Sequence, residues 1–361
     1  MMGRLLLLLG SLLLALTALE LGTRLLRGPE WLWQWPNLVA VHRAGSASDV
    51  ARYAAYDDRL GFIPLPGARL LNLAREDDGT IRRTNASHDA HGLRMAPAGT
   101  PVAQPGPAVL AAGDSFTYGA EVDDADTWPV ALQSLLGQSV VNAGVNGYGL
   151  DQIVLRAEMV ARTLHPRAIV VAMIHDDLRR AEMRRVWGAD KPYFTVEGET
   201  LSLRNVPVPP PTAQQTQLTL GQRLLGRSML VQTTMLAVGL MDAWSHDDTS
   251  VHPAGEGARI ACLLMKRLAA FGHEADARVV VVALYDADAW RRRWLGSLAR
   301  QQRALDATLS CAARAGLEAI DTYGPFDRAI SAGGVDALYH RWHPNAAGNR
   351  LIAELIAARL R

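Results

Sequence analysis

The chain has 361 residues, a formal net charge of +1, 49% hydrophobic residues and 20% charged residues. A chain of this length can bury a core without structural metals or disulfides, and this composition excludes the disordered, collagen-like and disulfide-scaffold classes. Because the net charge is close to zero, no overall field attracts nucleic acid, and we expect no nucleic-acid partner.

The chain begins with an apolar segment. Residues 5–19 carry no charge, and Leu21 and Gly22 extend the run past Glu20. As a helix, residues 5–22 would span about 27 Å, close to the hydrocarbon thickness of a bilayer. A cleaved signal peptide and an uncleaved signal anchor both fit this run. Since no A-x-A-like cleavage site follows it, we favour an anchor over residues 1–27, with single-pass insertion in the cytoplasmic (inner) membrane and the remaining chain exported.

A region rich in Pro, Gly, Asn and Asp follows the apolar run. Three tryptophans within residues 31–35 are placed either to lie at the membrane interface or to pack on the domain. Residues 28–106 are predicted to form an irregular N-terminal extension with short strands. His88 and His91 lie in this extension, but no further ligands are close in sequence, so we expect no metal site.

From residue 107 onward, apolar runs alternate with amphipathic stretches. Buried strands that alternate with helices predict an α/β sandwich with a parallel sheet over residues 107–361. Residues 180–250 break this rhythm and contain a proline-rich piece at 206–212, so we interpret them as an insertion that either caps the site or forms a surface excursion. The expected strands lie at 108–112, 140–142, 168–174, 278–284 and 317–321.

The two cysteines, Cys262 and Cys311, are far apart in sequence and lie outside any CxxC or Cys/His cluster. Nothing here builds a zinc site, and no cofactor is predicted. Each cysteine falls in a segment predicted to be an amphipathic helix, where a free cysteine packs as a small apolar residue. A disulfide remains the alternative if the domain lies outside the cytoplasm.

Three short motifs carry the chemistry. The first strand runs directly into residues 113–119 (GDSFTYG), and in an open parallel sheet ligands bind beyond the carboxyl ends of the strands. Ser115 lies on this turn; taken alone, it would also fit a helix cap. After the second strand, the glycine-rich turn 142–149 can bring backbone donors close to a substrate oxygen. Finally, His343 precedes the last helix, where it is placed to act on Ser115.

In order and spacing, these motifs resemble those of the SGNH (GDSL-type) serine hydrolase superfamily over residues 107–361. The resemblance implies a flavodoxin-like three-layer sandwich with strand order 2-1-3-4-5 and an acyl-enzyme mechanism. It implies Ser115 as nucleophile, His343 as general base and then acid, and the backbone N–H groups of Ser115 and Gly147 in the oxyanion hole. The chemistry agrees, because a serine hydroxyl needs a base to become a nucleophile and the developing oxyanion needs donors.

Two positions depart from the family pattern. The third strand normally ends in Gly-x-Asn-Asp, and here Asp176 occupies the position of the oxyanion-donating Asn. An ionised carboxylate cannot donate, so Asp176 either stays protonated through burial or forms an ion pair with an arginine such as Arg179. The acid that orients the family's histidine is replaced by His340. This leaves His340, Asp336 or a backbone carbonyl to orient the catalytic histidine, and a Ser–His dyad alone would be slower.

These features predict a membrane-anchored, extracytoplasmic serine ester hydrolase, either an O-acylesterase or an O-acyltransferase. Its expected partners are the membrane and an acylated small molecule, glycan or lipid of the cell envelope, an association that rests on fold and compartment. The alternative is a non-catalytic binding or scaffolding protein of the same fold. Asp176 and His340 favour that alternative, whereas Ser115, Gly147 and His343 favour the enzyme.

Overall fold

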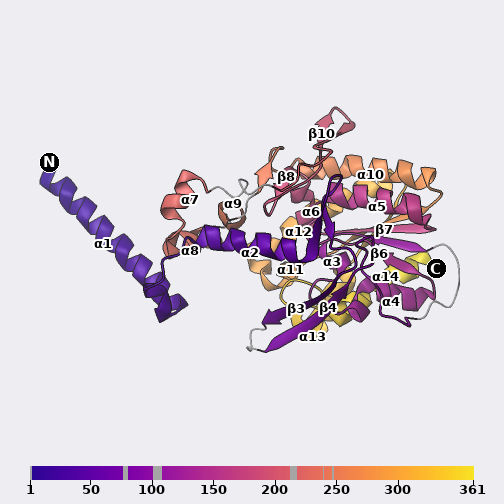
Figure 1. Cartoon of the computed structure of the whole chain (residues 1–361), viewed down its shortest axis with the longest axis horizontal. Coiled ribbons are helices and arrows are strands. Elements are labelled where there is room, and N and C mark those ends of the chain that lie inside the picture. Colours follow the sequence, from indigo (N-terminus) through magenta and orange to yellow (C-terminus); the bar gives the residue numbers. More distant parts are fainter. Residues whose placement is uncertain (1, 76–79, 101–107, 212–217, 239, 246–247) are drawn as a thin grey trace. The chain divides into compact units, whose positions relative to one another are not determined.

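The computed structural model describes residues 2–75, 80–100, 108–211, 218–238, 240–245 and 248–361 (Figure 1). The chain forms two compact units, which we call the N-terminal unit and the α/β unit. The N-terminal unit comprises Met1–Arg52, Arg185–Ala189 and Pro211–Thr249. The α/β unit comprises Tyr53–Arg184, Asp190–Pro210 and Ser250–Arg361.

A five-stranded parallel sheet forms the centre of the α/β unit (Figure 1). Its strands are β5 (Val109–Ala112), β6 (Val140–Asn142), β7 (Ala168–Met173), β13 (Arg278–Ala283) and β14 (Glu318–Asp321). They are arranged β6-β5-β7-β13-β14, which in chain order is 2-1-3-4-5. The order reverses between β5 and β7, and in open α/β sheets the crevice beyond the carboxyl ends at this switch point is where ligands bind.

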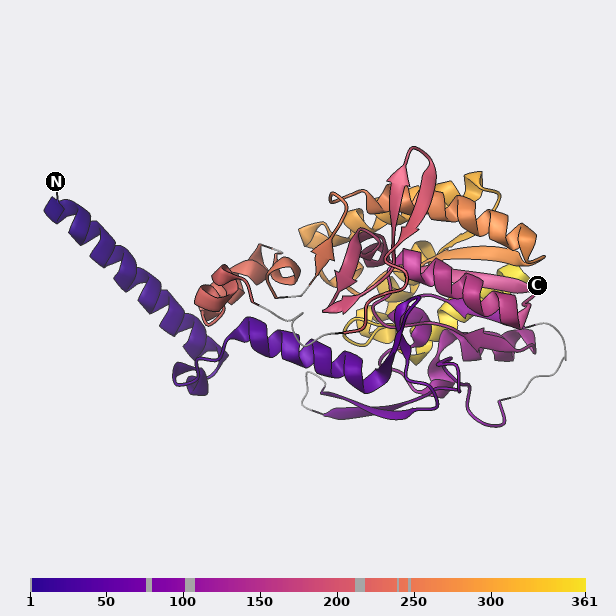
Figure 2. The same cartoon turned by 45° about the horizontal axis from the view of Figure 1, so that its top comes forward.

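The strands are buried on both faces, which explains their continuous apolar sequence. All residues of β5 and β7 are buried. One face packs on helices that contribute Trp128, Phe326 and Ile352 to a common core. The opposite face is covered by a second group of helices (Figure 2). The first group is α4 (Trp128–Leu136), α13 (Tyr323–Gly333) and α14 (Ala346–Leu360); the second is α5 (Leu150–Leu164), α10 (Gly257–Glu274) and α12 (Ser297–Arg314).

The region before the sheet contains short strands, as its sequence predicts. They form two antiparallel hairpins. In the second hairpin Leu71 and Leu73 are both exposed. Of the predicted extension, residues 76–79 and 101–106 lie outside the described residues. The hairpin strands are β1 (Ala54–Asp57), β2 (Gly61–Pro64), β3 (Arg69–Arg75) and β4 (Ile81–Ser87).

Several short elements lie at the ends of the sheet strands or between the helices. They are α3 (Ser115–Tyr118), η2 (Asp124–Asp126), α6 (His175–Arg180), β8 (Met183–Val186), β9 (Ala189–Asp190), β10 (Tyr193–Glu197), β11 (Thr200–Arg204), β12 (Thr249–Ser250), α11 (Asp288–Arg291), η4 (Arg293–Leu295) and η5 (Val335–Ala337). Two of them, α3 and α6, begin directly beyond β5 and β7. They therefore place side chains at the switch point of the sheet.

A disulfide joins two helices of the α/β unit. Cys262 in α10 is bonded to Cys311 in α12, with the two Cα atoms 5.1 Å apart. Of the two alternatives that the sequence leaves open, the structure has the bonded pair rather than two free cysteines. The two helices pack against each other in the folded protein. The bond therefore stabilises the fold mainly by reducing the conformational freedom of the unfolded chain.

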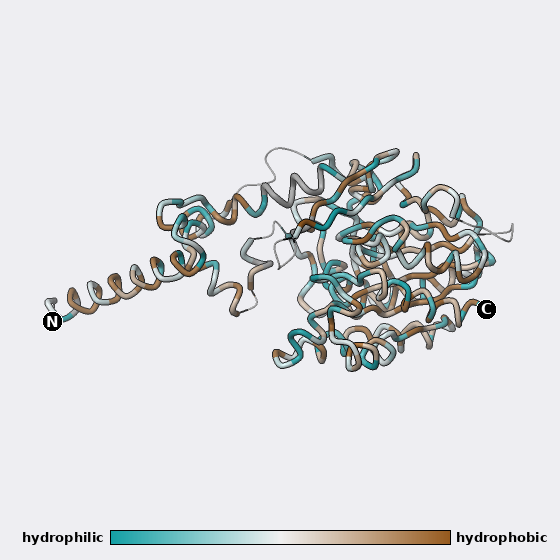
Figure 3. The backbone as a smooth tube through the Cα atoms, turned by 90° about the horizontal axis from the view of Figure 1, so that it is seen from below, coloured by the Kyte–Doolittle hydropathy of each residue, from teal (hydrophilic) through white to brown (hydrophobic). Residues whose placement is uncertain are grey.

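The N-terminal unit contains the apolar segment. The helix α1 (Met2–Arg27) is long and apolar enough over Leu6–Arg27 to cross a membrane (Figure 3), and its most apolar 18-residue window is not buried by the protein. Much of the predicted insertion, residues 211–249, belongs to this unit rather than to the α/β unit. Residues 212–217, 239 and 246–247 of the insertion lie outside the described residues. The unit's other helices are η1 (Pro29–Leu32), α2 (Leu38–Tyr53), α7 (Leu220–Leu225), α8 (Met229–Ala237) and α9 (Met241–Ser245).

Candidate active site

Ser115 lies at the tight turn between β5 and α3. The preceding residue, Asp114, is fully buried and accepts a hydrogen bond from the backbone N–H of Phe116 at 2.9 Å. This bond caps α3, so the capping role that the sequence alone suggests for Ser115 belongs to Asp114. The Ser115 side chain remains partly exposed at the carboxyl edge of the sheet.

His343 reaches the serine from the opposite end of the chain. Its Nε2 lies 3.0 Å from the Ser115 Oγ, within hydrogen-bonding distance, and its ring lies 5.1 Å from that of Phe116. Two residues later, the side chain of Asn345 accepts a bond from the Gly348 N–H at 3.0 Å and caps α14. The rigid start of α14 therefore holds the imidazole over the end of β5.

Glu121, which the sequence does not predict, lies behind the imidazole. Its Oε2 is 3.6 Å from Nδ1 of His343, an ion-pair distance that is longer than a standard hydrogen bond. Both atoms are buried, and within the described part of the chain neither has a hydrogen-bond partner. Although burial favours the neutral carboxyl, the adjacent His343 and the charges of Arg82 and His340 lower the pKa of Glu121. An ionised carboxylate therefore faces the second ring nitrogen of the histidine.

Glu121, rather than either residue that the sequence offers for this position, faces Nδ1 of His343. The Asp336 side chain is 89% exposed and pairs with Arg291, so it points into solvent rather than toward His343. His340 donates its backbone N–H to the carbonyl of His343 at 3.0 Å, and its charge is among those that lower the pKa of Glu121. The carboxylate that faces the imidazole thus comes from the turn that follows α3.

An unusual backbone and a buried arginine hold Glu121 in place. Glu121 has a φ of 70°, a left-handed conformation that costs a non-glycine residue about 1–3 kcal/mol and persists where surrounding contacts impose it. The buried Arg94 supplies those contacts, because it donates to the carbonyls of Tyr118 and Val122, each at 2.8 Å, and pairs with Asp124 at 2.9 Å. The guanidinium thus binds the turn on both sides of Glu121.

The glycine-rich turn after β6 lies beside the nucleophile. At Gly144 a Cβ atom would fall 2.2 Å from the Tyr118 backbone nitrogen, so only glycine allows the turn to approach α3 this closely. Gly147 has a φ of 78°, and Tyr53 donates to the carbonyl of Asn146 next to it at 2.8 Å. Within the described ranges, no protein acceptor takes the N–H of Ser115 or Gly147. Both N–H groups therefore remain available to an oxyanion.

Asp176, at the start of α6, is an ionised partner of two arginines. Its carboxylate lies 2.6 Å from Nε of Arg179 and 2.7 Å from Nη2 of Arg180. Burial alone would raise the pKa of Asp176, but these two guanidinium charges hold it well below its ordinary value. The structure therefore favours the ion-pair alternative over the protonated donor, because an ionised carboxylate has no proton to give.

Arg180 links the three loops that meet at the site. Besides Asp176, its guanidinium lies 2.8 Å from the buried Asp177 and 3.9 Å from Asp114, and it donates to the Tyr148 carbonyl at 3.3 Å. Burial and the charge of Asp114 raise the pKa of Asp177 well above its ordinary value. This arginine therefore connects α6 to the nucleophile turn and to the glycine-rich turn.

A second buried ion pair supports the glycine-rich turn. Lys191 pairs with Asp151, which lies in the first turn of α5, and also donates to the Met183 carbonyl at 2.9 Å. Neither charged side chain is more than 1% exposed. The lysine is therefore a structural partner of the helix that follows the turn, and it does not face a substrate.

The remaining histidines near the site have structural partners. Both ring nitrogens of His88 are engaged, one with the carbonyl of Leu65 at 3.0 Å and one with the Tyr118 hydroxyl at 2.9 Å. The Nδ1 of His175 lies 3.6 Å from the carboxylate of Asp286. Across the residues that the structure describes, no three His, Cys, Asp or Glu side chains gather as a metal site.

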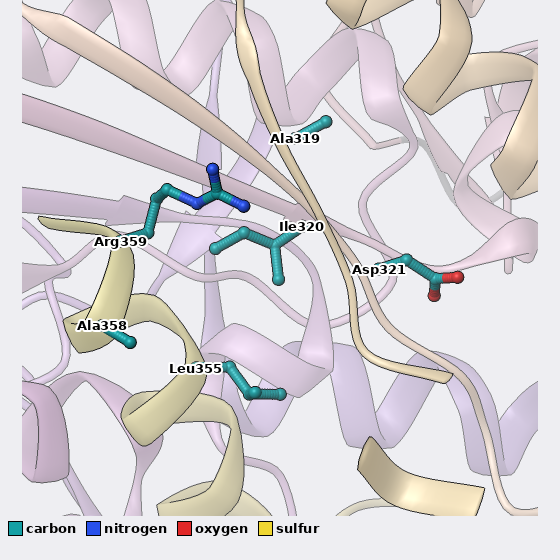
Figure 4. Close-up of a pocket in the computed structure, with 6 residues that line it drawn as sticks. All are labelled: Ala319, Ile320, Asp321, Leu355, Ala358 and Arg359. Atoms are coloured by element: carbon teal, nitrogen blue, oxygen red, sulfur yellow. The ribbon is translucent and has the colours of Figure 1, made fainter. Parts of the chain in front are cut away.

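A separate open pocket of about 430 Å³ lies at the outer edge of the sheet (Figure 4). It is formed by β14 and the end of α14, and Asp321 and Arg359 are its charged lining residues. Ser115 and His343 are not among the residues that line it. The pocket is therefore distinct from the site at the carboxyl ends of the strands.

Comparison with known proteins identifies one family. The profile of the GDSL-like Lipase/Acylhydrolase family matches residues 111–351, a span that contains the serine, the glycine-rich turn and His343. A search of curated proteins gave no match.

Solved structures of hydrolases are similar over most of their own length. An α/β hydrolase, LAE5, from the metagenome of Lake Arreo, Spain, has 16% identity and a TM-score of 0.45, covering 70% of this chain and 94% of that one. A catalytic mutant of the acetylxylan esterase Axe2 from Geobacillus stearothermophilus has 12% identity and a TM-score of 0.43, with coverages of 71% and 94%. A lipase/acylhydrolase from Enterococcus faecalis has 13% identity and a TM-score of 0.39, with coverages of 71% and 95%.

Proposed function

Because the chain belongs to the GDSL-like lipase/acylhydrolase family, and so to the ester-bond hydrolases, we propose that it is a membrane-anchored serine esterase with a Ser115–His343–Glu121 triad. The observation that carries the proposal is the 3.0 Å contact between the Ser115 Oγ and Nε2 of His343. A serine hydroxyl is a weak nucleophile, and an adjacent imidazole base is the group that activates it.

The proposed reaction proceeds through an acyl-enzyme. The Ser115 hydroxyl attacks the ester carbonyl as its proton passes to His343. The oxyanion that forms accepts hydrogen bonds from the backbone N–H groups of Ser115 and Gly147. Collapse expels the alcohol, which takes the proton from His343 and leaves the acyl group on the serine. Water then attacks in the same way, and the carboxylic acid leaves.

Glu121 acts through the histidine. An ionised carboxylate at Nδ1 selects the imidazole tautomer that presents a free Nε2 to the serine, and it stabilises the imidazolium that forms. The lowered pKa of Glu121 keeps it ionised at the pH at which the imidazole is neutral and can act as a base. The departures at Asp176 and His340 are thus compatible with catalysis, which weakens the non-catalytic alternative.

The substrate is proposed to be an acylated small molecule, glycan or lipid of the cell envelope. If an acceptor alcohol replaces water in the second step, the same machinery transfers the acyl group instead of hydrolysing it. The apolar α1 supports a single-pass anchor in the cytoplasmic membrane. The disulfide supports an extracytoplasmic α/β unit, because such bonds persist in oxidising compartments.

Two measurements on the full-length protein test this proposal. In detergent, a fluorophosphonate ester should label the protein, and p-nitrophenyl acetate should be hydrolysed, whereas Ser115→Ala should lose both while keeping its circular dichroism spectrum. Retention of labelling in Ser115→Ala would remove the assignment, and a folded wild type inert to both reagents would favour a non-catalytic role. In membranes, the protein should resist carbonate extraction with its N-terminus intact; a soluble form beginning after α1 would instead identify a signal peptide.

A further inference from the structure

The end of the apolar helix is joined to α8 by a carboxylate. Glu20 receives hydrogen bonds from the backbone N–H groups of Met229 and Leu230, each at 2.9 Å, and from the Ser228 hydroxyl at 2.7 Å. These donors form the N-terminus of α8, where the helix dipole favours negative charge. Arg24, one turn after Glu20 and 1% exposed, pairs with the same carboxylate at 2.6 Å. We call this set of contacts the Glu20 clasp.

Arg24 also ties the chain after α1 to the clasp. Its guanidinium donates to the carbonyls of Trp31 at 2.9 Å and Gln34 at 2.7 Å, and it stacks over the ring of Trp35 at 3.4 Å. The tryptophan-rich segment therefore folds back onto the end of α1. In membrane proteins, Trp and Tyr are enriched at the membrane–water interface, because one end of each side chain is apolar and the other is polar.

The clasp fixes the depth at which α8 begins. The uncharged run of α1 ends immediately before Glu20, so this residue marks the boundary between hydrocarbon and headgroups if α1 spans a bilayer. The first turn of α8 is bonded to that residue, and α8 contacts α1 near the end of α1 (Figure 2). Consequently α8 starts, and the preceding α7 ends, near the level of the lipid headgroups.

The segment that contains α7 and α8 carries apolar side chains that the N-terminal unit does not bury, three in α7, one in α8 and two directly after α8. Leu224 is 69% exposed and Leu236 is 61% exposed, and four further aliphatic residues between 220 and 240 are also exposed. We call these six residues the exposed apolar set. Each such side chain gains about 1.5–3 kcal/mol when it is fully removed from water. The set consists of Leu220, Leu224, Leu225, Leu236, Val238 and Leu240.

The charges on this stretch suit a lipid surface. Residues 218–241 contain no Asp or Glu, and they contain two arginines, Arg223 and Arg227, both exposed. Arg223 lies in α7 and Arg227 between the two helices, so this segment combines exposed aliphatic side chains with basic residues and no acidic ones, a composition that suits the interface of anionic membranes. Because the clasp already places the start of α8 beside the end of α1, the bilayer is the apolar phase within its reach.

From the clasp, the exposed apolar set and the charge pattern together, we propose that α7 and α8 lie in the headgroup region of the bilayer that contains α1. The chain is then held by a transmembrane helix and an interfacial helix pair rather than by α1 alone. The insertion, which the sequence offers as a cap for the site, would instead bind lipid. This inference rests on the proposed membrane anchor, and the experiment below separates the failure of one from the failure of the other.

The test uses full-length protein in phosphatidylcholine–phosphatidylglycerol vesicles that contain a nitroxide-bearing quencher lipid. Single cysteines are introduced by Leu13→Cys in α1 and Leu236→Cys in α8, both at exposed positions. A fluorophore is then attached without reductant, so that the native cysteines stay in their disulfide. Leu224→Cys provides a second, independent position in α7.

The proposal predicts that the labels at positions 13, 224 and 236 each lose emission to the quencher lipid, whereas the same labels keep their emission in vesicles without that lipid. Quenching at 13 without quenching at 224 and 236 would overturn the interfacial placement and leave the anchor intact. If no position is quenched, the anchor fails and the inference fails with it. If emission at 236 depends on protein concentration and not on quencher lipid, a second copy covers the set and the proposal is wrong.

Discussion

Nδ1 of His343 lies 3.6 Å from Oε2 of Glu121, a residue on the turn after α3 and far from His343 in sequence. The carboxylate therefore belongs to the same turn-and-helix segment as the nucleophile, not to the loop that carries the histidine. In the proposed mechanism, one local segment thus supplies both the attacking hydroxyl and the group that orients its base. The contacts that hold this segment are therefore expected to matter for catalysis as well as for stability.

Arg94→Met should loosen the turn that carries Glu121. The buried guanidinium donates to several carbonyls of the turn, and methionine would leave them without a partner. Loss of charge-assisted bonds of this kind costs about 2–3 kcal/mol, and we also expect a loss of activity of about tenfold or more as Glu121 moves. Urea denaturation and kcat on p-nitrophenyl acetate check both, with the exposed Arg83→Met on β4 as control. Wild-type values in Arg94→Met would show that the arginine does not position the turn.

Asp176→Asn should affect stability more than the pH dependence of the reaction. The ion pairs with Arg179 and Arg180 are weakened, at a cost of about 1–2 kcal/mol because the carboxylate is partly exposed. Since the pKa of Asp176 is lowered, it is already ionised across the working range and does not titrate on the alkaline side. The alkaline limbs of the pH–rate profiles of wild type and variant should therefore coincide. A limb that disappears only in Asp176→Asn would restore the protonated-donor role.

Lys191→Met should be among the most destabilising single changes in the α/β unit. The substitution leaves the carboxylate of Asp151 buried without its partner. We expect this to lower the free energy of unfolding by about 3–5 kcal/mol. The only other lysine, Lys266, is exposed and pairs with the exposed Glu199, so Lys266→Met should change stability by less than about 1 kcal/mol. The double variant Lys191→Met/Asp151→Leu should recover much of the loss. Equal stability of the two lysine variants would contradict the buried pair.

The Cys262–Cys311 bond should be present in protein isolated without reductant. Thiol titration of the denatured chain should find no free thiol before reduction and two after it. The variant Cys262→Ser/Cys311→Ser should lose about 2–4 kcal/mol of unfolding free energy, because its denatured state is no longer cross-linked. Two reactive thiols in native, unreduced protein would exclude the bond and remove one support for an extracytoplasmic location.

The sheet and the two members of the proposed Ser115–His343 pair follow from sequence, whereas the proposed acid does not. Buried strands leave unbroken apolar runs, and Ser115 and His343 lie in motifs whose positions relative to those runs are regular. Glu121 lies in an irregular turn, where no period marks it, and its approach to His343 depends on a φ of 70° that sequence does not encode visibly. Lys191 and Asp151 lie in distant segments of the chain, so the sequence does not show that they form a pair. A lysine or an aspartate in a sequence looks the same whether its side chain is buried or on the surface.

The insertion shows a second limit. The sequence predicts an insertion over residues 180–250, but not what it packs against. The N-terminus of α8 binds Glu20, the one acidic residue of α1, and the role of this residue becomes apparent only in the structure. A lone acidic residue in such a run is therefore a useful signal of a buried contact at the end of a membrane helix.

The comparison of Glu121→Gln with Asp336→Asn tests the central claim most directly, since both replace a carboxylate by an amide of the same size. With Glu121→Gln, kcat for p-nitrophenyl acetate should fall by about 10²–10⁴-fold, with KM changed little, because the imidazole loses the carboxylate that sets its tautomer. With Asp336→Asn, kcat should stay at the wild-type level, because that side chain points into solvent. A wild-type kcat in Glu121→Gln, or a large loss confined to Asp336→Asn, would contradict the Ser115–His343–Glu121 triad.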